Sequence, residues 1–177
     1  MHRPCRVGLK DWGSRMCGLG PVDRVVDLVG PAAVEVIVAV EQRAAAAVAA
    51  LPAEASGIIN ADLGAHNTVW HEGRPGLFDF NDTGIGPYAF DLARFLLTLQ
   101  RHEQARALQA AALDGYRSRT PLPHGWEEHG RTFASAADVF MLRYHAARAC
   151  VQTGHGERAQ AIMTRLLASG GYRFCSG

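Results

Sequence analysis

The chain has 177 residues, of which 48% are hydrophobic, and a formal net charge of +1. This length fits one domain that can bury a core of its own. The apolar content excludes a disordered chain, and the small net charge excludes a broad basic surface for nucleic acid or an anionic membrane. We therefore expect a folded protein whose partner is a small molecule, with no role for nucleic acid or a membrane.

Residues 1–30 contain glycine, proline and charged residues without a steady period, which predicts an irregular segment with a short helix near Val22–Leu28. No apolar stretch follows the first basic residues, as it would in a secretory signal, and no run of about eighteen apolar residues is present. The cysteines are spread along the chain without a CxxC pair, which is typical of reduced thiols. We expect a cytoplasmic protein. The cysteines are Cys5, Cys17, Cys150 and Cys175.

The first regular elements are expected between residues 31 and 80. Apolar residues recur with a helical period from Pro31 to Leu51. The short apolar run Gly57–Asn60 predicts a buried strand. Thr68–His71 and Pro75–Asp79 alternate around a glycine-containing turn, which predicts an antiparallel hairpin. The glycines and proline of the following "DTGIGP" segment predict a loop.

The rest of the chain has the pattern of successive helices. Apolar stripes cover Leu92–Leu99 and Ala105–Tyr116, and the segment "RTPLPHG" interrupts them. Further stripes predict a long helix from Phe133 to about Val151 and a last helix over Ala159–Leu167. We therefore expect an irregular segment, residues 1–30, before a helical domain, residues 31–177, with the loop and hairpin at 57–82. The predicted fold class is mainly α with a small β-hairpin, an α+β arrangement.

The predicted hairpin has chemical consequences at its open end. If its two strands pair, Asn67 lies beside Asp79 or Phe80. Asp62 precedes Asn67 in the short loop "DLGAHN", which keeps its carboxylate near the same place. These oxygen-bearing groups suit Mg²⁺, which takes one or two carboxylates together with the phosphates of a substrate.

Two segments resemble a known family. "GIINADLGAHNTVW" and "GLFDFNDTGIGPYAFDLA" are similar to the catalytic loop and metal-binding segment of aminoglycoside and choline kinase-type phosphotransferases. In that family the stretch commonly reads H-x-D-x-x-x-x-N and then I-D-F-D-D. The resemblance extends in layout over Val34–Leu167 and is most specific between Asn60 and Asp91. It implies the carboxy-terminal lobe of a protein-kinase-like fold, with ATP as phosphoryl donor, Mg²⁺ as cofactor and a hydroxyl group of a small molecule as acceptor.

The resemblance also implies roles for individual residues. Asp62 would be the catalytic base, and Asn67 and Asp79 would be ligands of Mg²⁺. Asp91 would brace the catalytic loop from the start of a helix. Asn60 stands where the family usually has histidine, so it would support the site through amide hydrogen bonds and not through a ring.

Asp82 and His66 are further candidates. Asp82 matches the second acid of the family's D-F-D-D, although "NDTG" is also an ordinary turn sequence. His66 and His71 flank Asn67, which raises the alternative of a metal-dependent hydrolase. We expect His71 to lie near the hairpin turn, away from the other candidate ligands.

The nucleotide-binding lobe of the family has no counterpart in the sequence. Lys10 is the only lysine and is not on a recognisable strand, so we assign no residue as the phosphate-anchoring lysine. "GLGP" at residues 18–21 does not form a phosphate loop either. Three hypotheses follow: an enzyme lobe that works with a separate or missing amino-terminal lobe, a non-catalytic binding module, and a metal-dependent hydrolase that uses His66.

Overall fold

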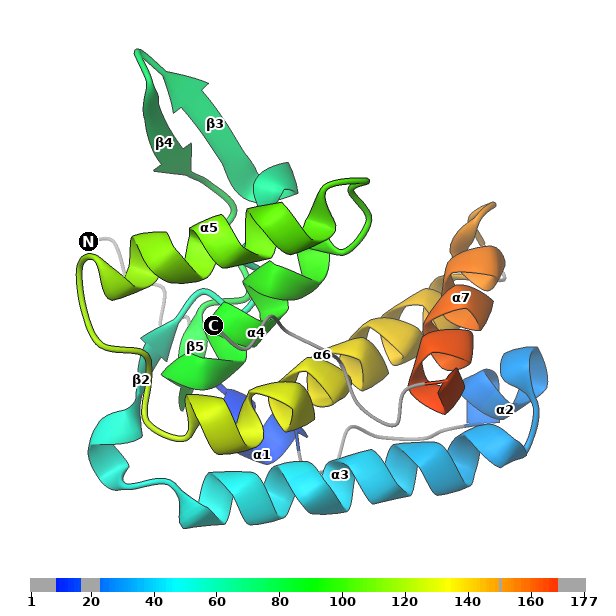
Figure 1. Cartoon of the computed structure of the whole chain (residues 1–177). Helices are drawn as coiled ribbons and strands as arrows, with labels where there is room; N and C mark the ends of the chain where they lie inside the picture. Colours follow the sequence, from blue (N-terminus) through cyan, green and yellow to red (C-terminus); the bar gives the residue numbers. More distant parts are fainter. Residues whose placement is uncertain (1–8, 17–22, 150, 169–177) are drawn as a thin grey trace, which may run out of the picture.

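The computed structural model describes residues 9–16, 23–149 and 151–168, and helices form most of it, with two small sheets beside them (Figure 1). The predicted class, mainly α with a small hairpin, is confirmed at this level. All four cysteines and the segment 18–21 lie outside the described residues. The predictions about thiols and about this segment therefore stay predictions.

The long helix α6 is the centre of the fold. It contacts α2, α3, α4 and α7, and its buried face includes Phe133 and Leu142. The predicted run of helices after residue 88 is confirmed, although α6 begins earlier and ends earlier than the apolar stripe indicated. No described helix combines the length and the hydrophobicity that crossing a membrane requires. The described helices are α1 (Trp12–Met16), α2 (Asp23–Val29), α3 (Ala32–Ala50), α4 (Tyr88–Leu99), α5 (Ala105–Arg117), α6 (Trp126–Arg148) and α7 (His155–Ala168).

The predicted hairpin is present. Strand β3 (Thr68–His71) pairs antiparallel with β4 (Arg74–Leu77), and Thr68 lies opposite Leu77. The second strand begins and ends slightly earlier than predicted. The hairpin projects away from the helices (Figure 1), and its strand residues are largely exposed to solvent.

A second sheet lies where a loop was expected. Strand β5 (Gly84–Pro87) is its middle strand, parallel to β1 (Lys10–Asp11) and antiparallel to β2 (Ser56–Ile59). The loop prediction for "DTGIGP" was therefore wrong. A Cβ atom on Gly84 would collide with the Lys10 backbone and the Trp12 ring, and one on Gly86 with Ile59 and Trp12. These glycines allow close packing between neighbouring elements and do not interrupt the strand.

The N-terminal segment is more regular than predicted. Residues 23–29 form the expected short helix, but residues 10–16 form β1 and α1 where an irregular segment was expected. Trp12 is completely buried, with its ring 5.7 Å from that of Phe90 and 5.0 Å from that of Phe140. Lys10 is on a strand, contrary to the prediction, because its backbone pairs with β5.

Candidate active site

A tight loop after β2 presents Asp62. The Asn60 Oδ1 atom accepts a hydrogen bond from the Asp62 backbone N–H at 3.0 Å. Asp91, in the first turn of α4, accepts bonds from the backbone N–H groups of Asn60 at 3.1 Å and Ala61 at 2.8 Å. Ala61 has a φ of 63°, a left-handed conformation that a non-glycine residue keeps only when its surroundings hold it. The contacts of Asn60 and Asp91 hold the loop in this conformation.

The carboxyl group of Asp91 is in a low-dielectric environment. Its burial raises its pKa above the ordinary value of 3.8. The hydrogen bonds from Asn60 and Ala61 and the positive charge of Arg94 oppose this rise, whereas the charge of Asp62 adds to it. Burial outweighs the opposing contacts, so folding favours the protonated form of Asp91.

Asp62 is held from three sides. The Asn67 Nδ2 atom donates to both the carbonyl oxygen and the Oδ2 atom of Asp62, each at 3.0 Å. The Arg94 Nη2 atom donates to Oδ1 at 2.7 Å, and the His66 Nε2 atom lies 3.3 Å from Oδ2. The carboxylate is thereby fixed in direction, which is what a group that orients a substrate hydroxyl requires.

Arg94 was not predicted as part of the site. It lies on α4 and is 8% exposed, although arginine is almost never this buried without a partner. The signal was its position three residues after Asp91 in an otherwise apolar stretch, which places both side chains on one face of the helix. That spacing predicts an arginine directed toward the same loop.

Asn67 and Asp79 come from the two sides of the hairpin base. The Asn67 carbonyl oxygen accepts a bond from the Phe78 backbone N–H at 3.1 Å, so Asn67 faces Phe78, one residue before the predicted partner. Asn67 donates through Nδ2 to Asp62, which leaves its Oδ1 atom as the one that can ligate a cation. Asp79 is exposed, has a left-handed φ of 60° and accepts a bond from Asn81 Nδ2 at 2.8 Å.

Asp82 connects the site with the N-terminal segment. Its carboxylate forms an ion pair with the Nζ atom of Lys10, and its carbonyl oxygen accepts a bond from Trp12 Nε1 at 2.7 Å. The chain's only lysine is therefore engaged with an acidic residue of the site.

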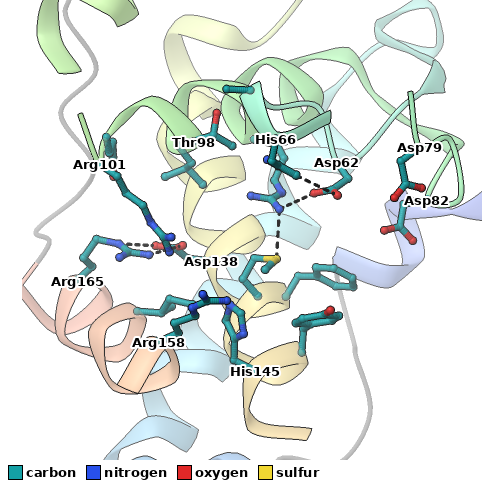
Figure 2. Close-up of a pocket in the computed structure, with 18 of the residues that line it drawn as sticks. Asp62, His66, Asp79, Asp82, Thr98, Arg101, Asp138, His145, Arg158 and Arg165 are labelled. Atoms are coloured by element: carbon teal, nitrogen blue, oxygen red, sulfur yellow. Dashed lines mark hydrogen bonds and ion pairs between the residues drawn. The ribbon is translucent and has the colours of Figure 1, made fainter. Parts of the chain in front are cut away.

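Asp62, His66, Asp79 and Asp82 line one open pocket of about 830 Å³ together with side chains of α4, α6 and α7. In Figure 2, Asp79 and Asp82 lie on one side, Asp62 is next to them, and arginines of the helices lie on the other side. Within the described ranges, no three His, Cys, Asp or Glu side chains are close enough to hold a metal by themselves. Of the two predicted Mg²⁺ ligands, Asp79 lines this pocket, whereas Asn67 is buried, is bonded to Asp62 and is not among the lining residues.

The histidines are separated. His66 contacts Asp62, whereas the side chain of His71 is 90% exposed at the end of the hairpin, as expected. A metal centre built from both histidines is therefore not supported by the described residues.

Comparisons with known proteins identify a family and a fold for this chain. A family model described as "Phosphotransferase enzyme family" matches residues 23–129. A solved structure of an amicoumacin kinase in complex with AMP-PNP, Ca²⁺ and Ami is similar, with a TM-score of 0.66 and 16% sequence identity. The match covers 94% of this chain and 53% of that kinase, so the chain spans about half of its length. This likeness shows the fold. A search of the curated proteins found no match.

Proposed function

Because the chain belongs to the phosphotransferase enzyme family, we propose that it is the catalytic and acceptor-binding part of an ATP-dependent kinase that acts on a hydroxyl group of a small molecule. The observation that carries the proposal is the fixed carboxylate of Asp62. It is held by Asn67 and Arg94 at a pocket that Asp79 also lines.

In this proposal Asp62 orients the acceptor hydroxyl and receives its proton. The hydroxyl oxygen forms a bond to the γ-phosphorus of ATP, the bond from that phosphorus to the bridging oxygen breaks, and ADP leaves with the electron pair. Arg94 keeps Asp62 in position through the 2.7 Å contact. Asn60 and Asp91 act indirectly, because they hold the loop that carries Asp62.

Asn67 Oδ1 and the carboxylate of Asp79 would hold Mg²⁺, with Asp82 as a further acidic neighbour. Asp79 and Asp82 line the pocket. Asn67 is not among the lining residues, but it is bonded to Asp62, which is. The ion, when bound, neutralises charge on the phosphates of the donor. Mg²⁺ commonly binds through one or two carboxylates plus substrate phosphates, so this donor set needs no third acidic ligand. The exposed position of Asp79 leaves room for those phosphates.

A second lobe would complete the nucleotide site. Ile58 of β2 and Ile85 of β5 lie opposite each other in the sheet and are 67% and 43% exposed. On the same strand as Ile58, Ile59 is buried against the core, so within the described ranges this sheet has one covered and one uncovered face. Exposed neighbouring apolar side chains of this kind mark an interaction surface. We infer that a separate or further segment with nucleotide-binding strands covers this face.

The alternative is a non-catalytic binding module. Two observations favour it: Asn60 replaces the usual histidine of the family, and Lys10 is paired with Asp82. A module of this kind would retain the pocket and lose phosphoryl transfer.

Two measurements on the full chain test the proposal: calorimetric binding of AMP-PNP with Mg²⁺, and release of ³²P from [γ-³²P]ATP, with and without a complementary amino-terminal kinase lobe. Asp79→Asn should weaken Mg²⁺-dependent nucleotide binding at least tenfold. Asp62→Asn should leave binding within about twofold and lower phosphoryl transfer about a hundredfold or more. Asp114→Asn, on the exposed surface of α5, is the matched control and should change neither.

Each outcome has a separate meaning. Nucleotide binding without turnover under any condition would favour the binding module. Absence of nucleotide binding, with or without the complementary lobe, would contradict the kinase. Equal binding by Asp79→Asn and the unmodified chain would contradict the metal role of Asp79.

A further inference from the structure

Five arginines line the pocket, and Arg101, Arg158 and Arg165 lie on the side away from Asp79 (Figure 2). Two of them are neutralised: Arg94 by Asp62 at 2.7 Å and Arg165 by Asp138 at 2.8 Å. The arginines that line the pocket are Arg94, Arg101, Arg148, Arg158 and Arg165.

The remaining three form no ion pair with a described residue, although the charge of Arg101 acts on Asp138 from beyond ion-pair distance. Within the described part of the chain, Arg101, Arg148 and Arg158 have no carboxylate within ion-pair distance, and all three line the pocket. Arg148 lies over the ring of Tyr144, with its guanidinium carbon 3.8 Å from the ring centre. Arg101 follows the end of α4 and Arg158 is in the first turn of α7, so the two approach the pocket from different helices.

His145 reports the positive potential of this region. Burial, the nearby His155 and the charges of Arg158, Arg101 and Arg94 together lower its pKa to about 4. His145 is therefore neutral at pH 7 and does not compete with the arginines for an anion. Its environment also disfavours any further positive charge.

Among the residues that the structure describes, no free carboxylate is available in this region to receive a cationic acceptor. Both oxygens of Asp138 are engaged by Arg165, Oδ2 with Nε at 3.1 Å and Oδ1 with Nη2 at 2.8 Å. This two-point pair is the strong geometry for an arginine and a carboxylate, so a ligand amine would have to displace it. The next carboxylates of the pocket, Asp62 and Asp82, are paired with Arg94 and Lys10.

We propose that the acceptor is an anionic hydroxy compound, whose carboxylate or phosphate group binds between Arg101 and Arg158 while its hydroxyl group reaches Asp62. This assignment rests on the proposed function, in which Asp79 is on the side of the phosphoryl donor. Asp79 and Asp82 lie on the opposite side of Asp62 from these arginines (Figure 2), so the arginine side is left for the acceptor. Arginine suits this role because its planar donor array matches carboxylate and phosphate groups.

The test uses sugars that share one scaffold and differ in charge. Glucose 6-phosphate and glucuronate are the anionic probes, glucose is neutral and glucosamine is cationic, and binding to the full chain is followed by NMR titration without nucleotide. We expect both anions, or one of them, to bind at least tenfold more tightly than glucose and glucosamine. The better anion identifies phosphate or carboxylate as the preferred group.

The variant Arg101→Gln/Arg158→Gln should reduce this preference at least tenfold. Arg43→Gln, an exposed residue on α3 outside the pocket, is the control and should leave binding unchanged. The proposal is overturned if neither anion binds at about 10 mM, if glucosamine binds best, or if the double variant keeps the preference. Loss of AMP-PNP binding in the double variant, with sugar binding intact, would place these arginines at the donor and also overturn it. Because binding is measured without turnover, a chain that binds the anions but transfers no phosphate would contradict only the proposed function.

Discussion

Replacement of Asp91 tests how the catalytic loop is held. Its carboxylate accepts two backbone hydrogen bonds, from Asn60 and Ala61, at 3.1 and 2.8 Å. Asp91→Ala leaves two N–H groups without an acceptor, and each costs about 1–3 kcal/mol if it stays buried. The substitution also removes a buried charge, which offsets part of this loss. We therefore expect Asp91→Ala to lower the free energy of unfolding by about 2–3 kcal/mol.

Asp91→Asn should behave differently. The amide oxygen of asparagine can still accept one of the two hydrogen bonds, and loss of the other lowers stability. Burial of an uncharged amide costs less free energy than burial of a carboxylate, so the two effects partly cancel. We expect a change within about 1 kcal/mol of the wild type. Urea denaturation measures both values, and hydrogen exchange of the Asn60 and Ala61 amides should become faster in Asp91→Ala. Equal destabilisation by the two substitutions, or unchanged hydrogen exchange in Asp91→Ala, would show that the two hydrogen bonds of Asp91 do not hold the loop.

The pH dependence supplies a second readout for Asp91. Burial raises the pKa of this carboxyl group above 3.8 in the folded state. A raised pKa of an acid means that the folded state binds more protons than the unfolded state. The contribution of Asp91 to the free energy of unfolding is therefore full below pH 3.8 and is lost as the pH rises through the pKa of the folded state. The wild type should therefore lose stability relative to Asp91→Asn as the pH rises above 3.8. A gain over that range would contradict the assigned burial.

Three further predictions concern other parts of the fold. The pKa of His145 is lowered from 6.5 to about 4, so the free energy of unfolding should fall as the pH drops through that range, by about 1 kcal/mol at pH 5.5. Thermal unfolding of His145→Gln should not show this pH dependence. Trp12→Phe should lower the free energy of unfolding by about 1–2 kcal/mol, because the Asp82 carbonyl loses its donor, and Trp12→Ala by about 3–5 kcal/mol; urea denaturation of both checks this. The uncovered sheet face should make the chain self-associate, and Ile58→Lys should reduce that association in sedimentation velocity without lowering the melting temperature; a monomeric wild type would contradict this.

Local patterns in the sequence predicted the elements that form from neighbouring residues. The alternation around Glu72 and Gly73 gave the hairpin, and the amphipathic stripes gave the helices after residue 88. The spacing of Asp62 and Asn67 on one short loop also brought two candidate groups into contact. In each case the partners are close in the chain, so the periodicity carries the information.

The periodicity of the sequence does not predict contacts between segments that are distant in the chain. Strand β5 was taken for a loop because glycine and proline usually break structure, whereas Gly84 serves the approach of Lys10, more than seventy residues earlier. The Arg94–Asp62 pair joins a helix to a loop, and its only local signal is the i, i+3 spacing with Asp91. The sequence patterns of the last helices predicted only their apolar faces. They did not indicate that arginines of these segments line the pocket.

In the proposed function, Asn67 and Asp79 share one divalent cation beside Asp62. Crystals of the chain soaked with Mn²⁺ and AMP-PNP would locate such an ion directly by its anomalous scattering. We expect a Mn²⁺ peak about 2 Å from Asn67 Oδ1 and from a carboxylate oxygen of Asp79, with the phosphates of AMP-PNP on its open side and Asp62 outside its ligand shell. An ion bound instead by His66 and Asp62, or no peak near Asp79 at saturating Mn²⁺, would contradict it.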